Sequence, residues 1–266
     1  MVVLIAFAAL AWQQDGGGDS PLNAIAAAAE RTQREPGGRT MMTAIATSPV
    51  PSKSLTITGR GVYSNETDRS RMVLTFPQPG SDGLMEMEAV TDGTAMYMRS
   101  SMFGSLPGGA EWMMLDLSLG GDMEAPVPAG GDAAGELELL ETATGGVQKL
   151  GKEDVRGVPT TRYRGTVEAS ERAEELREEG QDDLAAGIEK DMKPLTIEAW
   201  IDADGLVRRM RIVQAKAQAG GQESTVDMRL DFFDVGPVPE IEVPEQSEAF
   251  DATDLARAGL DQPSDD

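Results

Sequence analysis

Residues 83–100 read GLMEMEAVTDGTAMYMRS, and this stretch decides the fold. Its first half alternates apolar and acidic side chains, in the order Met85, Glu86, Met87, Glu88 and Ala89. A period of two predicts a β-strand with one buried face and one wet face. Asp92-Gly93 then leads into the run Met96-Tyr97-Met98, and an Asp-Gly pair between two such runs is typical of a two-residue type I′ hairpin. The stretch therefore predicts two neighbouring antiparallel strands.

The same period of two recurs on both sides of this hairpin. The predicted strands lie at residues 41–47, 55–61, 71–76, 111–117, 147–155, 160–167, 195–201, 206–212 and 226–232. Together with the hairpin they make about eleven strands. Strands and helices do not alternate regularly, which disfavours a parallel α/β sheet.

Helices are predicted in only a few places. Residues 22–35 (LNAIAAAAERTQRE) follow Ser20 and Pro21, a suitable N-cap and first helical residue, and end before Pro36-Gly37. Residues 133–144 predict a second helix, and the charged residues 168–193 predict one or two exposed helices. Between the strands, residues 120–131 form a long Gly- and Pro-rich loop that is a candidate lid.

The fold class expected from these elements is α+β and dominated by β-strands. Because so few helices cannot cover about eleven strands, two arrangements are open. The sheet closes or curls on itself, or it wraps around the helices and leaves apolar space for a ligand.

Composition excludes several functions. The chain has 266 residues, a net charge of −23, and neither histidine nor cysteine. So acidic a chain repels nucleic acid, and without His or Cys it lacks the common catalytic bases, thiol nucleophiles, disulfides and zinc ligands. Asp202-Ala203-Asp204-Gly205 begins like a calcium loop but lacks its later ligands, which favours a hairpin turn. We expect no enzyme activity, no cofactor and no metal site.

The two ends of the chain differ from its middle. Residues 1–12 are apolar and too short for a membrane-spanning helix; with Ala9-Leu10-Ala11 they predict an export signal or anchor, and a Gly-rich tether follows. Residues 240–266 carry nine acidic residues and a single basic one, which predicts a mostly extended, solvated segment docked around residues 250–255. We expect residues 1–21 to be signal and tether, residues 22–239 a single domain, and residues 240–266 an acidic C-terminal segment.

Methionine is unusually frequent, with 15 residues against 12 aromatic ones. Its flexible side chain can line a cavity that repacks around an irregular apolar guest, or it can simply fill an imperfect core. Both interpretations stay open from composition. The methionines at apolar strand positions are Met72, Met85, Met87, Met96, Met98, Met210 and Met228.

Four stretches together resemble the lipoprotein-carrier (LolA-like) superfamily, nearest to the mycobacterial LppX/LprG-type lipid-binding lipoproteins. They are residues 83–100, residues 106–112 (LPGGAEW), residues 155–163 (VRGVPTTRY) and residues 198–209 (EAWIDADGLVRR). The resemblance covers roughly residues 22–254. It implies a large antiparallel half-barrel wrapped over a few helices, with an apolar cavity between them.

The resemblance also implies a function. This is binding or transport of lipids or other acylated molecules outside the cytoplasmic membrane, without catalysis, by a monomer that meets an envelope protein partner. The alternative is an envelope interaction or stress-sensing module on the same fold. Family members carry a lipid-modified cysteine after the signal, which this chain lacks. Two alternatives stay open: release after cleavage at Ala11, or attachment through an uncleaved N-terminus. The expected cavity lining is Met72, Leu74, Phe76, Met85, Met87, Met96, Met98, Met210, Ile212, Met228 and Leu230.

Overall fold

A computed structural model describes residues 21–47, 54–78, 80–81, 83–116, 145–167, 195–217 and 223–255, and the single positions 170, 173 and 177. Several predicted segments lie outside the described residues. They are the export signal and tether up to residue 20, the loop at 120–131, the helix at 133–144, nearly all of 168–193, and residues 256–266.

Twelve strands form one sheet in the order β12-β6-β5-β4-β3-β2-β1-β11-β10-β9-β8-β7. Their bounds are β1 Gly37–Thr47, β2 Leu55–Ser64, β3 Arg69–Pro77, β4 Leu84–Asp92, β5 Ala95–Ser100, β6 Trp112–Asp116, β7 Gly145–Val155, β8 Val158–Val167, β9 Leu195–Asp202, β10 Val207–Ala217, β11 Glu223–Phe233 and β12 Ala249–Asp251. The remaining described elements are the helix α1 (Pro21–Gln33) and the short 3₁₀ turns η2 (Ser101–Phe103), η3 (Pro107–Gly109) and η5 (Gln246–Glu248).

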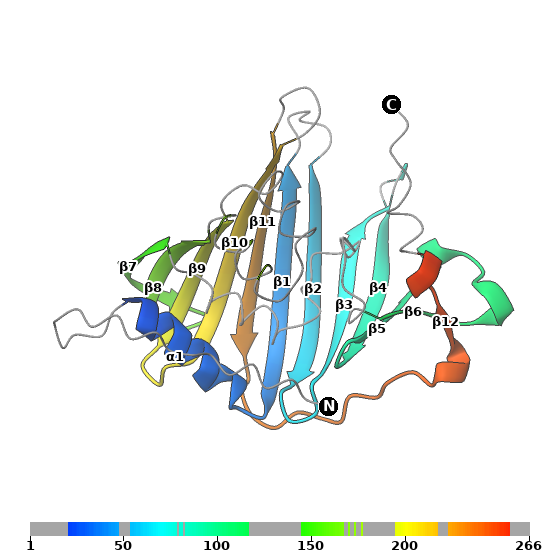
Figure 1. Cartoon of the computed structure of the whole chain (residues 1–266), viewed down its shortest axis with the longest axis horizontal. Helices are drawn as coiled ribbons and strands as arrows, with labels where there is room; N and C mark the ends of the chain where they lie inside the picture. Colours follow the sequence, from blue (N-terminus) through cyan, green and yellow to red (C-terminus); the bar gives the residue numbers. More distant parts are fainter. Residues whose placement is uncertain are drawn as a thin grey trace.

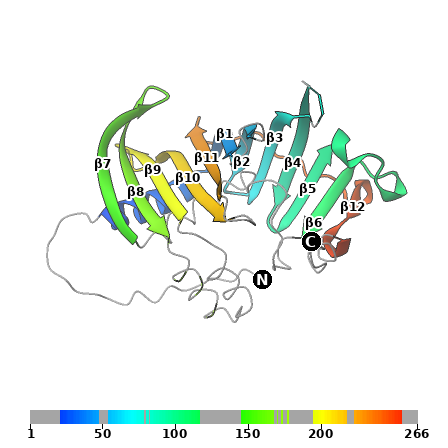
Figure 2. The ribbon, with the colours of Figure 1, turned by 90° about the horizontal axis from the view of Figure 1, so that it is seen from above.

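The sheet is antiparallel except at one edge, where β12 runs parallel to β6. Figure 1 shows long strands side by side from β7 to β4, with α1 crossing one end of the sheet. Seen from above, the strands follow an open arc (Figure 2). The predicted fold class is therefore confirmed, and the sheet is curled rather than closed into a barrel.

The eleven predicted strands correspond to β1 to β11, and the count misses β12. β12 has only three residues, too few to show a period of two. The hairpin between β4 and β5 lies where it was predicted, but its loop is shifted by one residue. Asp92 pairs with Ala95, so the loop is Gly93-Thr94. Only Gly93 of these two has a positive φ, which excludes type I′.

α1 is tied to the sheet by hydrogen bonds at its C-terminal end. The Thr32 hydroxyl accepts a hydrogen bond from the backbone N–H of Val207, at 2.9 Å, at the start of β10. Asn65, in the turn between β2 and β3, donates its side-chain amide to the carbonyl oxygens of Thr32 at 3.1 Å and Glu35 at 2.8 Å. The last carbonyls of a helix have no partner within it, so Asn65 acts as an external cap.

Replacing this cap should loosen the helix. We expect Asn65→Ala to lower the free energy of unfolding by about 1–2 kcal/mol, because the Glu35 carbonyl loses its side-chain donor and the Thr32 carbonyl keeps only the Glu35 N–H. Urea denaturation followed by circular dichroism measures the change. Thr67→Ala in the same exposed turn is the matched control and should stay within about 0.5 kcal/mol of the wild type. Equal stability of the Asn65 variant and the control would contradict the capping role.

The segment after β11 packs on the sheet before it forms β12. Ile241 is buried against Val90 of β4 and Trp112 of β6, and Val243 packs on the same cluster. The guanidinium of Arg99 lies 4.5 Å from the centre of the Trp112 ring. The contact of residues 240–255 with the sheet thus begins at Ile241, upstream of the docked stretch expected around residue 250.

Candidate binding site

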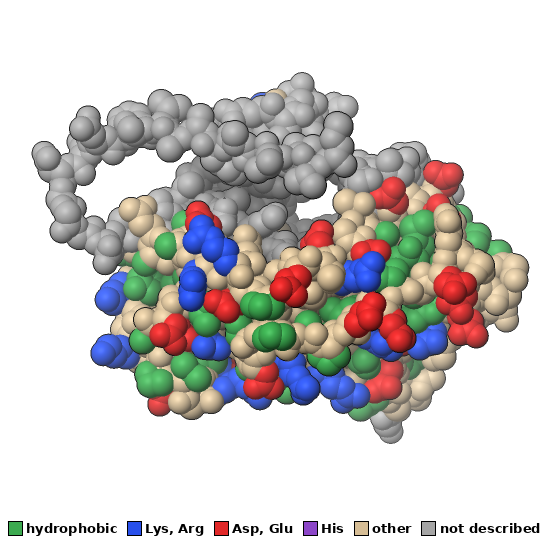
Figure 3. All heavy atoms as spheres, turned by 90° about the horizontal axis from the view of Figure 1, so that it is seen from below, with side chains coloured by type: hydrophobic (Ala, Val, Ile, Leu, Met, Phe, Trp, Pro, Cys, Tyr) green, Lys and Arg blue, Asp and Glu red, His purple; other side chains and the backbone are tan. Residues whose placement is uncertain are grey.

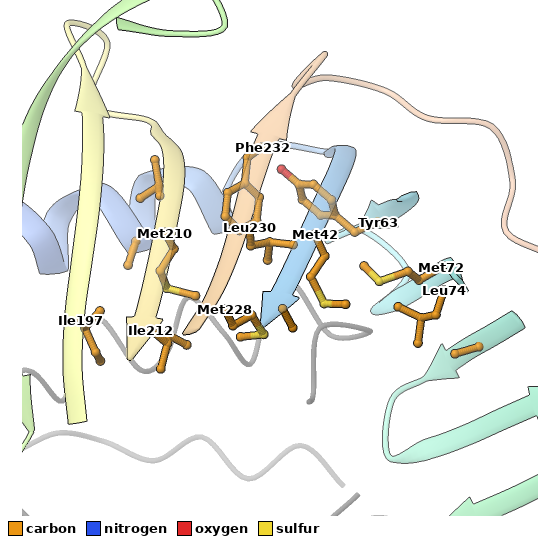
Figure 4. Close-up of a cluster of buried hydrophobic side chains, with 14 of the residues drawn as sticks. Met42, Tyr63, Met72, Leu74, Ile197, Met210, Ile212, Met228, Leu230 and Phe232 are labelled. Atoms are coloured by element: carbon orange, nitrogen blue, oxygen red, sulfur yellow. The ribbon is translucent and has the colours of Figure 1, made fainter. Parts of the chain in front are cut away.

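One face of the sheet, here called the apolar face, is lined by side chains from nearly every strand. The pairing register sets its rows, because residues opposite one another on neighbouring strands point to the same side. One row across β4, β3, β2, β1, β11, β10 and β9 consists of Met87, Leu74, Gly59, Met42, Leu230, Met210 and Ala199. Figure 4 shows several of these side chains gathered in one layer.

All eleven predicted lining residues fall on the apolar face by this register. Nine of them are buried, and Phe76 and Met85 are half-buried. The nine belong to one contiguous cluster that also contains residues of α1. Whether these side chains line a cavity and contact a ligand stays a prediction.

The apolar face holds further residues that the sequence did not single out. Met42, Tyr63, Ile197 and Phe232 are all buried in the same cluster. Tyr63 lies two residues beyond the predicted end of its strand, and Met42 stands in a run where both neighbours are uncharged and one is also methionine. Met42 and Tyr63 could therefore not be assigned to a face from the sequence, and the cross-strand pairing places them. Ile197 and Phe232 follow the alternation of their own strands but were not chosen as lining residues.

Among the described residues, α1 is the α-helix that packs on this face. Its buried side chains Ile25, Ala28 and Ala29 join the apolar cluster, and the helix contacts β7, β8, β9 and β10. The methionine-rich part of the face, on β3, β4 and β5, lies beyond this contact. The two halves of the face are therefore covered differently by the described elements.

Tyr63 places one polar atom in this apolar layer. Its side chain is 3% exposed, and its ring meets the ring of Phe232 edge-on at 5.9 Å, as Figure 4 shows. The ring fits because Gly38 lies opposite on β1: a Cβ there would come within 2.9 Å of the Tyr63 hydroxyl oxygen. That hydroxyl has no hydrogen-bond partner among the described residues. Burial raises the pKa of Tyr63 to about 12.

The raised pKa makes stability depend on alkaline pH. The unfolded chain releases the Tyr63 proton near pH 10, the ordinary pKa, whereas the folded chain holds it to about 12. Folding stability should therefore fall as the pH rises from about 10 to about 12, by about 3 kcal/mol for this group. Tyr63→Phe removes this loss, and near pH 7 it should be as stable as the wild type or more stable by about 1 kcal/mol.

Urea denaturation of both proteins at a series of pH values measures the difference. Tyr97→Phe, which removes one phenol from the opposite face, is the control. A gap between wild type and Tyr63→Phe that does not widen above pH 10 would contradict the buried, unpartnered state of the hydroxyl.

The opposite face, here called the polar face, is rich in ion pairs. Glu198 of β9, with a side chain only 1% exposed, accepts hydrogen bonds from Arg164 at 2.7 Å, Arg162 at 2.8 Å and Arg211 at 3.3 Å. Burial alone would raise the pKa of Glu198, but the hydrogen bonds from these arginines outweigh burial and hold the pKa below its usual value. Figure 3 shows basic and acidic side chains intermingled over the surface seen from below.

The described residues contain neither a candidate metal site nor a candidate membrane-spanning helix. No group of three acidic side chains in this part of the chain is arranged to hold a metal ion. None of the described helices has both the length and the apolar character needed to cross a bilayer.

Comparison with known proteins gives distant relatives. No family model matches the chain. An uncharacterised 31.2 kDa protein of Streptomyces griseus, from the rplA-rplJ intergenic region, is 28% identical over 194 residues. The match covers 68% of this chain and 61% of that protein, so this chain spans about three fifths of its relative's length.

Two solved mycobacterial structures also align with the chain. LprF from Mycobacterium bovis covers 85% of this chain and 98% of its own, with 13% identity and a TM-score of 0.44. The lipoprotein LppX of Mycobacterium tuberculosis covers 84% of this chain and 98% of its own, with 15% identity and a TM-score of 0.46. The similarity to LppX-type proteins, which was expected from residues 83–100, 106–112, 155–163 and 198–209 of the sequence, is found again in this alignment.

Proposed function

We propose that the apolar face binds the acyl chains of a lipid or another acylated molecule, without catalysis. The observation that carries this proposal is the continuous layer of apolar side chains on one side of an open, curled sheet. Seven of the methionines lie buried in that layer: Met42, Met72, Met87, Met96, Met98, Met210 and Met228.

The composition of the layer suits a guest of variable shape. Methionine is unbranched and polarisable, and it adopts several conformations at low energetic cost. Leucine or isoleucine in its place would define a more rigid surface. A wall built largely of methionine can therefore repack around acyl chains that differ in length or branching, whereas a single fixed core has no need of such freedom.

The free energy gained by burying methylene groups supports binding of a long acyl chain. Each buried methylene contributes about 0.8 kcal/mol, so about ten methylenes contribute on the order of 8 kcal/mol before the entropy of association is subtracted. A net free energy of that size would give an affinity of about 1 μM, so once the entropy of association is subtracted a chain of ten methylenes binds more weakly than this. Chains much shorter than this should bind weakly.

The proposed place of binding is outside the cytoplasmic membrane. The apolar N-terminal residues and the family resemblance support a place outside the cytoplasmic membrane, where acyl ligands are exchanged between membranes and proteins. The net charge of −23 would keep most of the surface away from anionic head groups. Transport and an envelope protein partner are further parts of this proposal.

Native mass spectrometry of the full chain, purified without detergent, is the first test. We expect a bound mass in stoichiometric amount, identified as an acylated molecule after solvent extraction. A protein that carries no such mass, and takes up none from a mixture of phospholipids and fatty acids, would overturn the lipid-binding proposal. A module that binds an envelope protein would then be the better explanation of the fold.

Filling the apolar face should abolish binding. Met87 of β4 and Met98 of β5 are both nearly inaccessible, and we expect Met87→Trp combined with Met98→Trp to lower the affinity for a fluorescent fatty acid by at least about tenfold. The indole rings occupy volume that an acyl chain would need. The measurement is a fluorescence titration of the purified variants.

The matched control is Met87→Leu combined with Met98→Leu, which conserves volume and should bind within about threefold of the wild type. Met85→Trp is the second test variant, because Met85 is half-buried and tolerates a larger ring. Undiminished uptake by a folded tryptophan variant would place the acyl chain elsewhere.

A further inference from the structure

The polar face contains a hollow of about 370 Å³ in the half of the sheet that runs from β1 to β7. Its walls come from β1, β7, β8, β9, β10 and β11, and they include Thr43, Ile45, Arg162, Trp200, Arg211 and Arg229. The hollow lies on the side of the sheet opposite to the apolar face, because these residues have the other parity in the strand register. It is therefore separate from the proposed lipid site.

Most charged groups in the walls already neutralise one another. Glu198 is shared by three arginines, as described above. Asp227 accepts two hydrogen bonds from Arg211, at 2.9 and 2.6 Å, which raise the pKa of that arginine. Glu153 accepts a hydrogen bond from the indole N–H of Trp200 at 3.0 Å.

Arg229 is the exception in this network. It lies directly opposite Arg211 on β10 and Thr43 on β1, and its side chain is exposed. No hydrogen bond or close ion pair joins it to another described residue, because its acidic neighbour Asp227 accepts both of its hydrogen bonds from Arg211; the charge of Arg229 acts on Asp227 only at longer range and helps to lower the pKa of that carboxyl. Like charges directly opposite one another on neighbouring strands are destabilising.

Two other donors in the walls are also unused. The Nε–H of Arg162 is buried without a hydrogen-bond partner in the described part of the chain. The hydroxyl of Thr43 is not hydrogen-bonded to any described residue, and it lies across from Arg229. A buried donor without a partner costs about 1–3 kcal/mol of folding free energy. A ligand oxygen that accepts a hydrogen bond from the Arg162 Nε–H would remove this cost.

The walls of the hollow carry a net positive charge, which is the sign that an anionic ligand needs. Four arginines and three carboxylates line the hollow, which leaves one positive charge on a protein whose net charge is −23. We propose that this hollow binds an oxyanion of the phosphate or carboxylate class, held by Arg229 and the Thr43 hydroxyl. Ile45, whose side chain is exposed, would contact an apolar part of the same molecule.

The oxyanion has two sources, a free small molecule or the head group of a lipid. The acidity of the whole protein opposes approach to an anionic bilayer, whereas a small anion screened by salt reaches the hollow more easily. A free anion is therefore the source that the charge distribution favours.

Inorganic phosphate is the first probe, titrated into the full-length ¹⁵N-labelled protein while the arginine Nε–Hε signals are followed by NMR. We expect a saturable shift of the Arg229 and Arg162 signals. Arg229→Gln should weaken phosphate binding by about tenfold or more, and Thr43→Val by a smaller factor. Because Arg229 has no described partner, its variant should fold as the wild type does.

Arg34→Gln is the matched control, because it removes one exposed positive charge next to the C-terminal end of α1, outside the hollow, and should leave the affinity unchanged. Sedimentation with phosphatidylglycerol and phosphatidylcholine vesicles tests the second source. Binding to phosphatidylglycerol vesicles that is lost in Arg229→Gln would support the same site with a lipid head group as its ligand. The absence of a saturable shift with phosphate and of vesicle binding, or equal affinities of wild type and Arg229→Gln, would overturn the proposal.

Discussion

Nearly every strand of the sheet contributes apolar side chains to one and the same side, and the rest of the structure depends on that shared register. A slip of one residue in any pairing would turn a row such as Met42, Leu74 and Met87 toward the opposite surface and expose it. The apolar cluster continues across so many strands only because no slip occurs between β1 and its neighbours. The position of α1 follows from the same constraint, since its small buried residues pack on a surface that the register creates.

The polar face fixes the register from the other side. Glu198 meets arginines on both neighbouring strands, Arg164 on β8 and Arg211 on β10, and also reaches the next residue on the same face of β8, Arg162. An isolated surface ion pair contributes little to stability, but a carboxylate buried among three arginines would leave uncompensated charges if its strand shifted. The network therefore penalises wrong pairings more than it strengthens the right one.

The sequence was sufficient to predict most of the sheet, because a period of two is visible in each strand that has one wet face. Parity placed Met72 with Leu74 on one face of their strand, and Met96 with Met98 on one face of theirs, before any pairing was known; the pairing then puts these faces on the same side of the sheet. It could not place β12, whose three residues are too short for a pattern, or Ile241, which is buried from an irregular segment. These positions depend on contacts between residues far apart in the chain.

The side-chain environment was harder to predict than the strands. A sequence with 46 acidic residues offers no sign that Glu198 and Asp231 are buried, because many strands have charges on their wet face. The unpartnered hydroxyl of Tyr63 arises from its position opposite Gly38, which only the pairing of β1 with β2 reveals. The arginines around the polar hollow likewise meet only when β8, β10 and β11 lie in order.

The two edges of the sheet have a consequence for behaviour in concentrated solution. An open sheet presents unpaired backbone groups at its edges, and these are templates for edge-to-edge aggregation. One edge here ends in β12, which is only three residues long, and is followed by a turn whose Thr253 hydroxyl accepts a hydrogen bond from the Asp116 N–H of β6. The other edge, β7, is interrupted by register shifts and carries Lys149, Lys152, Glu153 and Asp154. Both edges thus discourage the addition of a strand from another molecule, although the sheet never closes.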